Sequence, residues 1–202
     1  MNERRRDFLD ELLETGAPTG FETAAQRVWI DHLSDVADEV RTDAYGNAVA
    51  VREGSGDGPT VVVTGHGDEI GFVVRRIDDD GFLHLSRVGG TDKTVSRGQH
   101  VTIRTDDGPV NGVIGQTAIH LRDGEDDEVA EITEQHVDIG ADDGDEARDL
   151  VDVGDPLTVA SGVEALQGTR LTGRAMDNRV GTWSAAEVLR NAVENDVDAT
   201  VK

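Results

Sequence analysis

Cysteine is absent from this 202-residue chain, and lysine, aromatic residues and long apolar runs are scarce. Without cysteine there is no disulfide framework and no thiolate metal site, so any metal must be bound by histidine and carboxylate side chains. No stretch approaches the roughly 18 consecutive apolar residues of a membrane span. No apolar run follows the basic cluster Arg4-Arg5-Arg6 as a signal peptide requires. These absences favour a cytoplasmic protein without a membrane span.

Negative charge is what the chain has in excess. Its 42 acidic residues against 19 lysines and arginines give a formal net charge of −23, and all but Lys93 and Lys202 of those 19 are arginines. The carboxylates are spread over the whole sequence, which favours a salt-adapted cytoplasmic protein over an acidic surface that binds a partner or mimics nucleic acid. Nucleic-acid binding needs a basic surface, so the charge balance argues against that class of protein.

Apolar periodicity at the start of the chain predicts helices followed by strands. Residues 3–14 place four apolar side chains on one helical face, and a second helix begins at about Glu22. Residues 37–53 are typical of two short strands around a turn. The run Thr60–Thr64 is short, β-branched and apolar, which predicts a strand buried on both faces of a parallel sheet.

Between about Gly71 and Ala165 the pattern changes to short β-branched runs separated by Asp-Gly turns. Five of these runs are typical of strands: 72–77, 82–85, 101–105, 110–114 and 157–159. They predict a small β-barrel or sandwich. The acidic stretch 123–134 is expected to be a solvated loop or a short helix, and another short helix is expected near 145–150.

After Gly168 the sequence returns to an α/β pattern. Residues 169–172 are expected to form a strand, and a helix is expected from Asp177 to about Glu194. Its predicted buried stripe, with Glu187 near the edge, consists of Val180, Trp183, Val188, Ala192 and Val193. The predicted fold class is therefore α/β. Residues 1–70 and 166–202 are expected to form one partial mixed-sheet domain, interrupted by an inserted β-barrel-like domain of residues 71–165.

Two places in the sequence can carry chemistry. His66 and Asp68 follow the strand 60–64, at the edge of an α/β sheet where ligands bind, and glycines flank them. A His-x-Asp pair can supply a metal ligand and a carboxylate that fixes the imidazole, although a polar loop is the commoner role of such residues. Asp177 opens the last helix, where a carboxylate is typical of an N-cap and can also bridge two metal ions.

A series of motifs, in matching order and spacing, resembles the N-terminal part of the tetrahedral (TET-type) glutamyl and deblocking aminopeptidases. The most distinctive are G-A-P-T-G-F-E at 16–22, D-A-Y-G-N at 43–47, H-G-D-E-I-G at 66–71 and A-M-D-N-R-V-G at 175–181. Further matches fall at 81–90, 112–115, 119–121 and 137–141. The resemblance extends over nearly the whole chain.

This resemblance implies a zinc-peptidase fold and a hydrolase that removes N-terminal residues from short peptides with two divalent metal ions, zinc or cobalt. It implies that His66 is a terminal ligand of one metal, that Asp177 bridges both, and that Asp68 is the catalytic-site carboxylate that orients His66. The bond between Asp177 and Asn178 can then be a cis peptide. The other histidines match no ligand position and are expected to be solvated or structural: His32, His84, His100, His120 and His136.

The resemblance also implies homo-oligomers, from a dimer to a tetrahedral dodecamer, in which the inserted domain serves dimerisation and assembly. The family's pattern continues beyond this sequence to a Glu-Glu pair, which supplies the general base and a metal ligand, and to later ligands. With His66 and Asp177 alone, this chain is expected to bind metal at most weakly and to be inactive.

Two alternatives remain open on the sequence. One is a non-catalytic oligomerisation or binding module. The other is glycoside hydrolysis by the carboxylates of Asp68 and Asp177, which needs no metal. If His66 and Asp177 are ligands, their side chains must converge although they lie far apart in the sequence. If the sheet is unfinished, apolar strand faces must be exposed.

Overall fold

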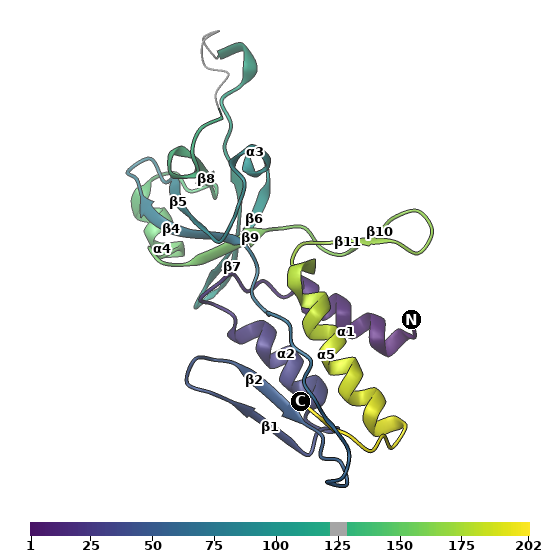
Figure 1. Cartoon of the computed structure of the whole chain (residues 1–202). Coiled ribbons are helices and arrows are strands. Elements are labelled where there is room, and N and C mark those ends of the chain that lie inside the picture. Colours follow the sequence, from purple (N-terminus) through teal and green to yellow (C-terminus); the bar gives the residue numbers. More distant parts are fainter. Residues whose placement is uncertain (122–128) are drawn as a thin grey trace. The chain divides into compact units, whose positions relative to one another are not determined.

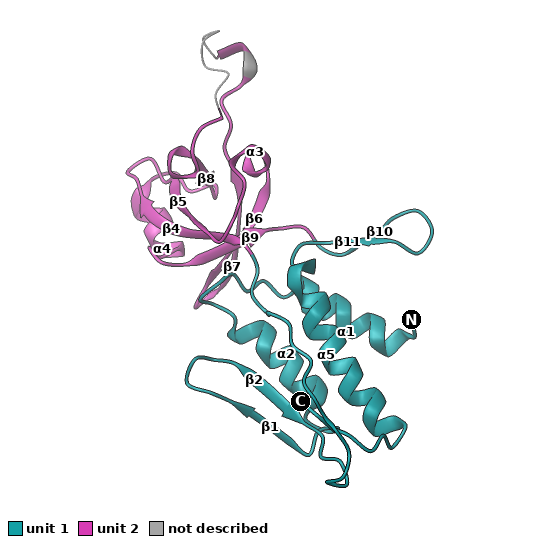
Figure 2. Ribbon diagram, viewed as in Figure 1, with its two compact units in different colours: residues 1–69, 162–202 teal, residues 70–161 magenta. Residues whose placement is uncertain are grey.

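The computed structural model describes residues 1–121 and 129–202 and divides the chain into two compact units (Figure 2). Unit 1 consists of residues 1–69 and 162–202, and unit 2 consists of residues 70–161. Residues 122–128, which include the first part of the predicted acidic stretch 123–134, lie outside the described residues. The remainder of that stretch contains a 3-10 helix, η2 (Ile132–Glu134).

Unit 1 is a mixed α/β arrangement of helices and short two-stranded sheets (Figure 1). Its helices are α1 (Glu3–Glu14), α2 (Thr23–Leu33) and α5 (Met176–Glu194). Two pairs of strands are antiparallel: β1 (Glu39–Thr42) with β2 (Ala48–Val51), and β10 (Glu164–Ala165) with β11 (Leu171–Thr172). The third pair, β3 (Thr60–Val61) with β12 (Thr200–Val201), is parallel.

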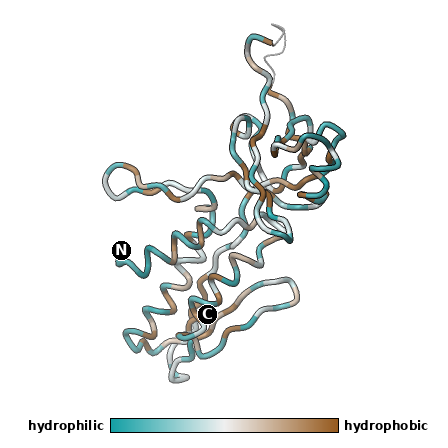
Figure 3. Tube along the Cα trace, turned by 180° about the vertical axis from the view of Figure 1, so that it is seen from behind, coloured by the Kyte–Doolittle hydropathy of each residue, from teal (hydrophilic) through white to brown (hydrophobic). Residues whose placement is uncertain are grey.

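The three helices of unit 1 pack against one another through their apolar faces. Apolar and polar stretches alternate along the helices (Figure 3), as expected of amphipathic helices at the surface of a core. The buried side chains that form this core are Phe8, Leu12, Leu33, Ala50, Ala186, Leu189, Ala192 and Val201. The predicted apolar face of α1 is confirmed, since its buried residues are the four that the periodicity selects.

The predicted buried stripe of α5 is partly wrong. Val180, Val188 and Val193 are exposed, whereas Glu187 is buried. Glu187 can be buried because two arginines of α1 neutralise it, with Arg5 Nε at 2.6 Å and Arg4 Nη1 at 3.3 Å from its carboxylate. The buried face of α5 therefore combines Glu187, which was expected near the edge of the stripe, with the apolar residues Ala186, Leu189 and Ala192.

The prediction that the strand 60–64 is buried on both faces is also wrong. β3 contains only Thr60 and Val61, and the side chains of Val61 and Val62 are 40% and 64% exposed. In the part of the chain that the structure describes, β12 is the neighbour of β3 and no further strand pairs with it. Apolar strand faces are thus exposed here, as expected of an unfinished sheet.

Unit 2 is a closed antiparallel barrel with the strand order β4-β5-β8-β7-β6-β9. Its strands are β4 (Gly71–Ile77), β5 (Leu83–Val88), β6 (His100–Thr105), β7 (Gly108–Ile114), β8 (His136–Asp138) and β9 (Pro156–Val159). Five of these confirm the predicted strands. The sixth, β8, was missed because it is three residues long and carries two polar side chains. Short helices α3 (Lys93–Ser96) and α4 (Gly144–Leu150) lie in the connections, together with the 3-10 helix η1 (Ile119–Leu121).

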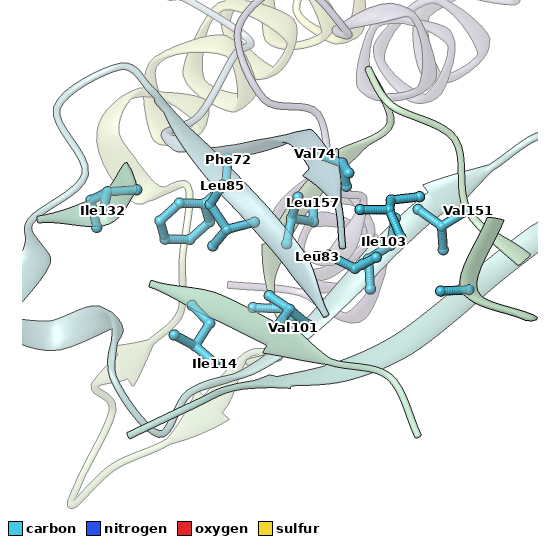
Figure 4. Close-up of a cluster of buried hydrophobic side chains, with 13 residues drawn as sticks. Phe72, Val74, Leu83, Leu85, Val101, Ile103, Ile114, Ile132, Val151 and Leu157 are labelled. Atoms are coloured by element: carbon cyan, nitrogen blue, oxygen red, sulfur yellow. The ribbon is translucent and has the colours of Figure 1, made fainter. Parts of the chain in front are cut away.

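The interior of the barrel is filled by alternating apolar side chains of its strands (Figure 4). The wholly buried members that belong to strands are Leu83, Leu85, Val101, Ile103, Ile114, Val137 and Leu157, and Ala147 of α4 is wholly buried with them. The barrel is therefore a packed core and holds no central channel. Across residues 1–121 and 129–202, none of the helices has the length and hydrophobicity that a membrane crossing requires.

Candidate functional site

His66, Asp68 and Asp177 come together within unit 1. His66 and Asp68 lie in the loop that follows β3, and Asp177 lies at the start of α5. His66 Nε2 is 3.3 Å from Asp177 Oδ1, and His66 Nδ1 is 2.9 Å from Asp68 Oδ1. The expected convergence of His66 and Asp177 is thus confirmed. Both side chains are open to solvent, with exposed fractions of 55% and 97%.

The backbone at the start of α5 presents the carboxylate of Asp177. Ala175 has a left-handed conformation, Asp177 and Asn178 have non-helical dihedral angles, and the peptide bond between them is cis. Asn178 Oδ1 accepts a hydrogen bond from the Gly181 N–H at 2.9 Å, so Asn178 caps the regular part of the helix. The interpretation of Asp177 as the N-cap is therefore wrong, and its carboxylate remains available to other partners.

Two glycines allow the His66 loop and α5 to approach each other. A Cβ atom on Gly65 would lie 2.5 Å from the Thr182 backbone nitrogen and 2.6 Å from the Gly181 carbonyl carbon. A Cβ atom on Gly181 would lie 2.4 Å from Asn178 Oδ1, the capping atom. Gly65 is needed because backbone lies against backbone, and this contact sets the spacing between the loop and the helix start. Gly181 is needed because the capping side chain of Asn178 occupies the space that a Cβ atom would fill.

Asp68 is held as a carboxylate between two donors. The Thr19 hydroxyl donates to Asp68 Oδ2 at 2.5 Å, and His66 Nδ1 contacts the other oxygen. Partial burial alone would raise the pKa of Asp68, but these hydrogen bonds outweigh it and lower the pKa below its ordinary value. An ionised Asp68 accepts the Nδ1 proton of His66, which leaves Nε2 as the nitrogen that faces Asp177.

The other histidines make other contacts or are exposed. His32 stacks on Phe8 with a ring separation of 3.5 Å, and His84 contacts Asp78 at 2.7 Å. His136 packs against Phe82 in the barrel. His100 and His120 are exposed. No group of three or more histidine, aspartate or glutamate side chains within residues 1–121 and 129–202 is arranged to hold a metal ion.

Three charged residues beside the site were not singled out by the sequence: Glu69, Arg174 and Arg179. The Glu69 carboxylate contacts Arg174 Nη1 and Arg179 Nη2, and it is buried. Glu69 and Arg179 belong to the motifs at 66–71 and 175–181 that carry the candidate ligands. Their position in these motifs was the available signal, but charged residues are expected on the surface, so burial was not predicted.

The sequence of this chain is similar to those of known aminopeptidases. Residues 46–202 match the family described as M42 glutamyl aminopeptidase. A lysyl aminopeptidase of Pyrococcus furiosus is 31% identical over 196 residues, which cover 95% of this chain and 56% of that protein.

Solved structures show the same similarity. The TET aminopeptidase of a marine sediment archaeon of the Thaumarchaeota superimposes with a TM-score of 0.92 at 30% identity, covering 98% of this chain and 57% of that chain. The Pyrococcus horikoshii TET1 peptidase, which can assemble into a tetrahedron or a large octahedral shell, gives 0.87 at 29% identity, with coverage of 98% and 59%. This chain thus spans somewhat more than half the length of each of these proteins.

Proposed function

Because the chain belongs to the M42 glutamyl aminopeptidase family, we propose that it is the first portion of a metal-dependent aminopeptidase in which His66 and Asp177 bind divalent metal. The observation that carries the proposal is that His66 Nε2 and Asp177 Oδ1, which belong to the two separate segments of unit 1, lie 3.3 Å apart. The substrates of the whole enzyme would be peptides, from which it hydrolyses N-terminal residues.

The two donor atoms suit a zinc or cobalt ion. With bond lengths near 2.1 Å and tetrahedral angles, two ligands of one zinc ion lie about 3.4 Å apart, close to the separation found here. An imidazole nitrogen and a carboxylate oxygen are both electron-pair donors, so a cation placed between them would be attracted to both. The exposure of both side chains leaves room for a second metal on the other oxygen of Asp177.

Each residue has a distinct task in this proposal. A bound metal pair would act as a Lewis acid and would lower the pKa of a bound water molecule. His66 would bind a metal through Nε2. Asp68 accepts the Nδ1 proton of His66 and thereby fixes the tautomer and the ring orientation. The carboxylate of Asp177 is held away from helix capping, since Asn178 fulfils that role, and is free to bridge.

We expect the isolated chain to bind metal weakly and to lack peptidase activity. A catalytic zinc ion needs about three protein ligands, and a base must take the proton of the attacking water. The described residues supply one histidine and one shared aspartate at this site and include no cluster of three metal-binding groups. The general-base glutamate and the later ligands would have to come from the part of the enzyme that follows residue 202.

Unit 2 is proposed to serve dimerisation and assembly. Its barrel has a core of its own and contains none of the three site residues, so it can contribute to assembly without altering the chemistry. The Pyrococcus horikoshii TET1 peptidase can assemble into a tetrahedron or a large octahedral shell. A purely non-catalytic oligomerisation module is the alternative. That alternative predicts a stable oligomer whose size and stability are unchanged by zinc.

Glycoside hydrolysis by Asp68 and Asp177 has less support. Such a mechanism needs one carboxyl group that stays protonated to act as the acid, which requires a raised pKa. The hydrogen bonds from Thr19 and His66 lower the pKa of Asp68 instead. Asp68 is therefore suited to hold an imidazole and unsuited to donate a proton to a leaving group.

Metal titration tests the proposed function. Zinc added to the chain should shift the backbone amide resonances of residues 66–68 and 177–178 in NMR spectra, with a dissociation constant that rises at least about tenfold in His66→Ala and in Asp177→Asn. His120→Ala is the matched control, because His120 is exposed and belongs to unit 2. Equal zinc affinity in His66→Ala and the unaltered chain would contradict the proposal.

A further inference from the structure

A buried ion pair lies within the two segments that carry the candidate ligands. Glu69 follows His66 and Asp68 in the same loop, and Arg179 follows Asp177 in α5. Their side chains are 2% and 0% exposed, and Arg179 Nη2 lies 3.2 Å from Glu69 Oε1. Burying a carboxylate and a guanidinium is costly unless both are paired and hydrogen-bonded, so their presence here calls for a reason beyond filling a core.

The guanidinium of Arg179 joins three separate segments of unit 1. Its Nε donates to the Gly67 carbonyl at 2.8 Å. Its Nη1 donates to the carbonyls of Leu12, at 2.5 Å, and of Thr15, at the end of α1. The planar fork of arginine presents these donors in fixed directions, so the side chain sets the relative positions of α1, the His66 loop and α5.

Glu69 makes further contacts between the segments of unit 1. Its Oε1 accepts a hydrogen bond from the Ala17 N–H at 2.8 Å, and Arg174 Nη1 contacts both of its oxygens. Along the backbone, the Glu69 N–H donates to the Ala17 carbonyl, and the Thr19 N–H donates to the Glu69 carbonyl, each at 3.1 Å. The loop that supplies Thr19 to Asp68 is thereby tied to the loop that carries Asp68 itself.

The contacts of this pair include the residue next to the candidate ligand His66. Gly67, whose carbonyl Arg179 holds, separates His66 from Asp68, and Arg179 lies two residues after Asp177. We propose that Glu69 and Arg179 are positioning residues, which fix the His66 loop against the start of α5 and so set the separation of His66 and Asp177. The expected effect on metal binding rests on the proposed function. The fixed position of the His66 loop rests on the buried contacts alone.

A role in stability alone is the competing explanation. A buried ion pair is weak support for stability, since apolar replacements of similar volume often stabilise a protein. If the pair served stability only, any variant that still folds would keep the loop ordered and the ligands in place. If the pair positions the loop, a folded variant would lose order at residues 66–68 and 177–178 specifically.

The test compares Arg179→Lys, which keeps the charge and loses the fork, with Arg190→Lys. Arg190 is the matched control because it also belongs to α5 and donates to a backbone carbonyl, that of His32, away from the site. The first measurement uses the metal-free chain: backbone 15N order parameters at 66–68 and 177–178 should fall in Arg179→Lys and remain unchanged in Arg190→Lys. The second is a zinc titration followed at His66, where the dissociation constant should rise about 10- to 100-fold in Arg179→Lys only.

Glu69→Gln keeps the test decisive if Arg179→Lys does not fold. Glutamine preserves the shape of the side chain and an acceptor for the Ala17 N–H, but it removes the charge that pairs with Arg179. Lower order parameters at 66–68 in a folded Glu69→Gln support the proposal. Unchanged order parameters in every folded variant of the pair would overturn it, as would equal losses in Arg190→Lys. An unaltered chain that shows no zinc-dependent shift at His66 would refute the proposed metal site, while the order parameters would still decide the positioning role.

Discussion

At the scale of single residues, His32 couples stability to pH. Its ring stacks on Phe8, and Arg4 Nη1 lies 3.3 Å from its Nε2. Burial, followed by the Arg190 guanidinium, lowers the pKa of His32 below its ordinary value of 6.5, although Glu187 at 3.5 Å acts in the opposite direction. The unfolded chain therefore binds a proton at this position more readily than the folded chain does.

Because the pKa of His32 is lower in the folded chain than in the unfolded chain, the folded chain loses stability in acid. The stability associated with a neutral, buried His32 is fully present above pH 6.5 and is lost as the pH falls through the lower folded-state pKa. We expect the free energy of unfolding to fall less between about pH 7 and about pH 5 in His32→Gln than in the unaltered chain. Urea unfolding at each pH measures this. His120→Gln is the control, and an equal pH dependence in all three proteins would refute the assignment.

Single residues also show how far the sequence alone could predict the site. The residue types and their positions at strand and helix ends made His66, Asp68 and Asp177 candidates, and the resemblance of their motifs to a peptidase family implied their roles. Glu69 and Arg179 lie in the same motifs, but their burial was missed. It is stabilised by hydrogen bonds with α1 and the loop after it. Those contacts come from segments far away in the sequence.

At the scale of elements, the barrel of unit 2 depends on strand side chains that point inward. Leu85 is 0% exposed, whereas Leu150, in α4 of the same unit, is 45% exposed. We expect Leu85→Ala to lower the free energy of unfolding by about 2–5 kcal/mol and Leu150→Ala by less than about 1 kcal/mol. Far-UV circular dichroism follows the unfolding of unit 2. Both tryptophans, Trp29 and Trp183, lie in unit 1, so tryptophan fluorescence reports the unfolding of unit 1 in parallel. Equal costs for the two variants would contradict this assignment of the barrel core.

The elements themselves were predictable to different degrees. The helix 3–14 and five barrel strands followed from local periodicity, which is determined within each segment. The burial of β3 and the buried face of α5 were not predictable in this way. Val61 is exposed because a strand needs neighbours to cover it, and Val188 is exposed because Glu187, paired with Arg5, occupies the buried face. Both outcomes depend on partners elsewhere in the chain.

At the scale of the whole molecule, the net charge of −23 should make stability depend on salt. Like charges repel in the compact state, and raising the ionic strength from 0.1 M to 1 M shortens the Debye length from about 10 Å to about 3 Å. We expect the melting temperature to rise with KCl, with most of the rise below about 0.5 M, where screening changes fastest. Calorimetry over a KCl series measures it. A melting temperature that is constant or falls over this range would contradict the proposed adaptation to salt.

The pairing of β4 with β9 also bears on how unit 1 can be assembled from two distant pieces of chain. Phe72 pairs with Leu157 across these strands, so the barrel brings its own first and last strands side by side. Joining Glu69 to Gly162 through an unstructured segment of roughly 90 residues would cost about 4 kcal/mol of loop-closure entropy. Once the barrel has formed, the connection shortens to the few residues outside these two strands, and most of that entropic cost has already been met by the barrel's own folding. A closed barrel whose first and last strands are neighbours is thus an insertion that a host domain can accept with little loss of stability.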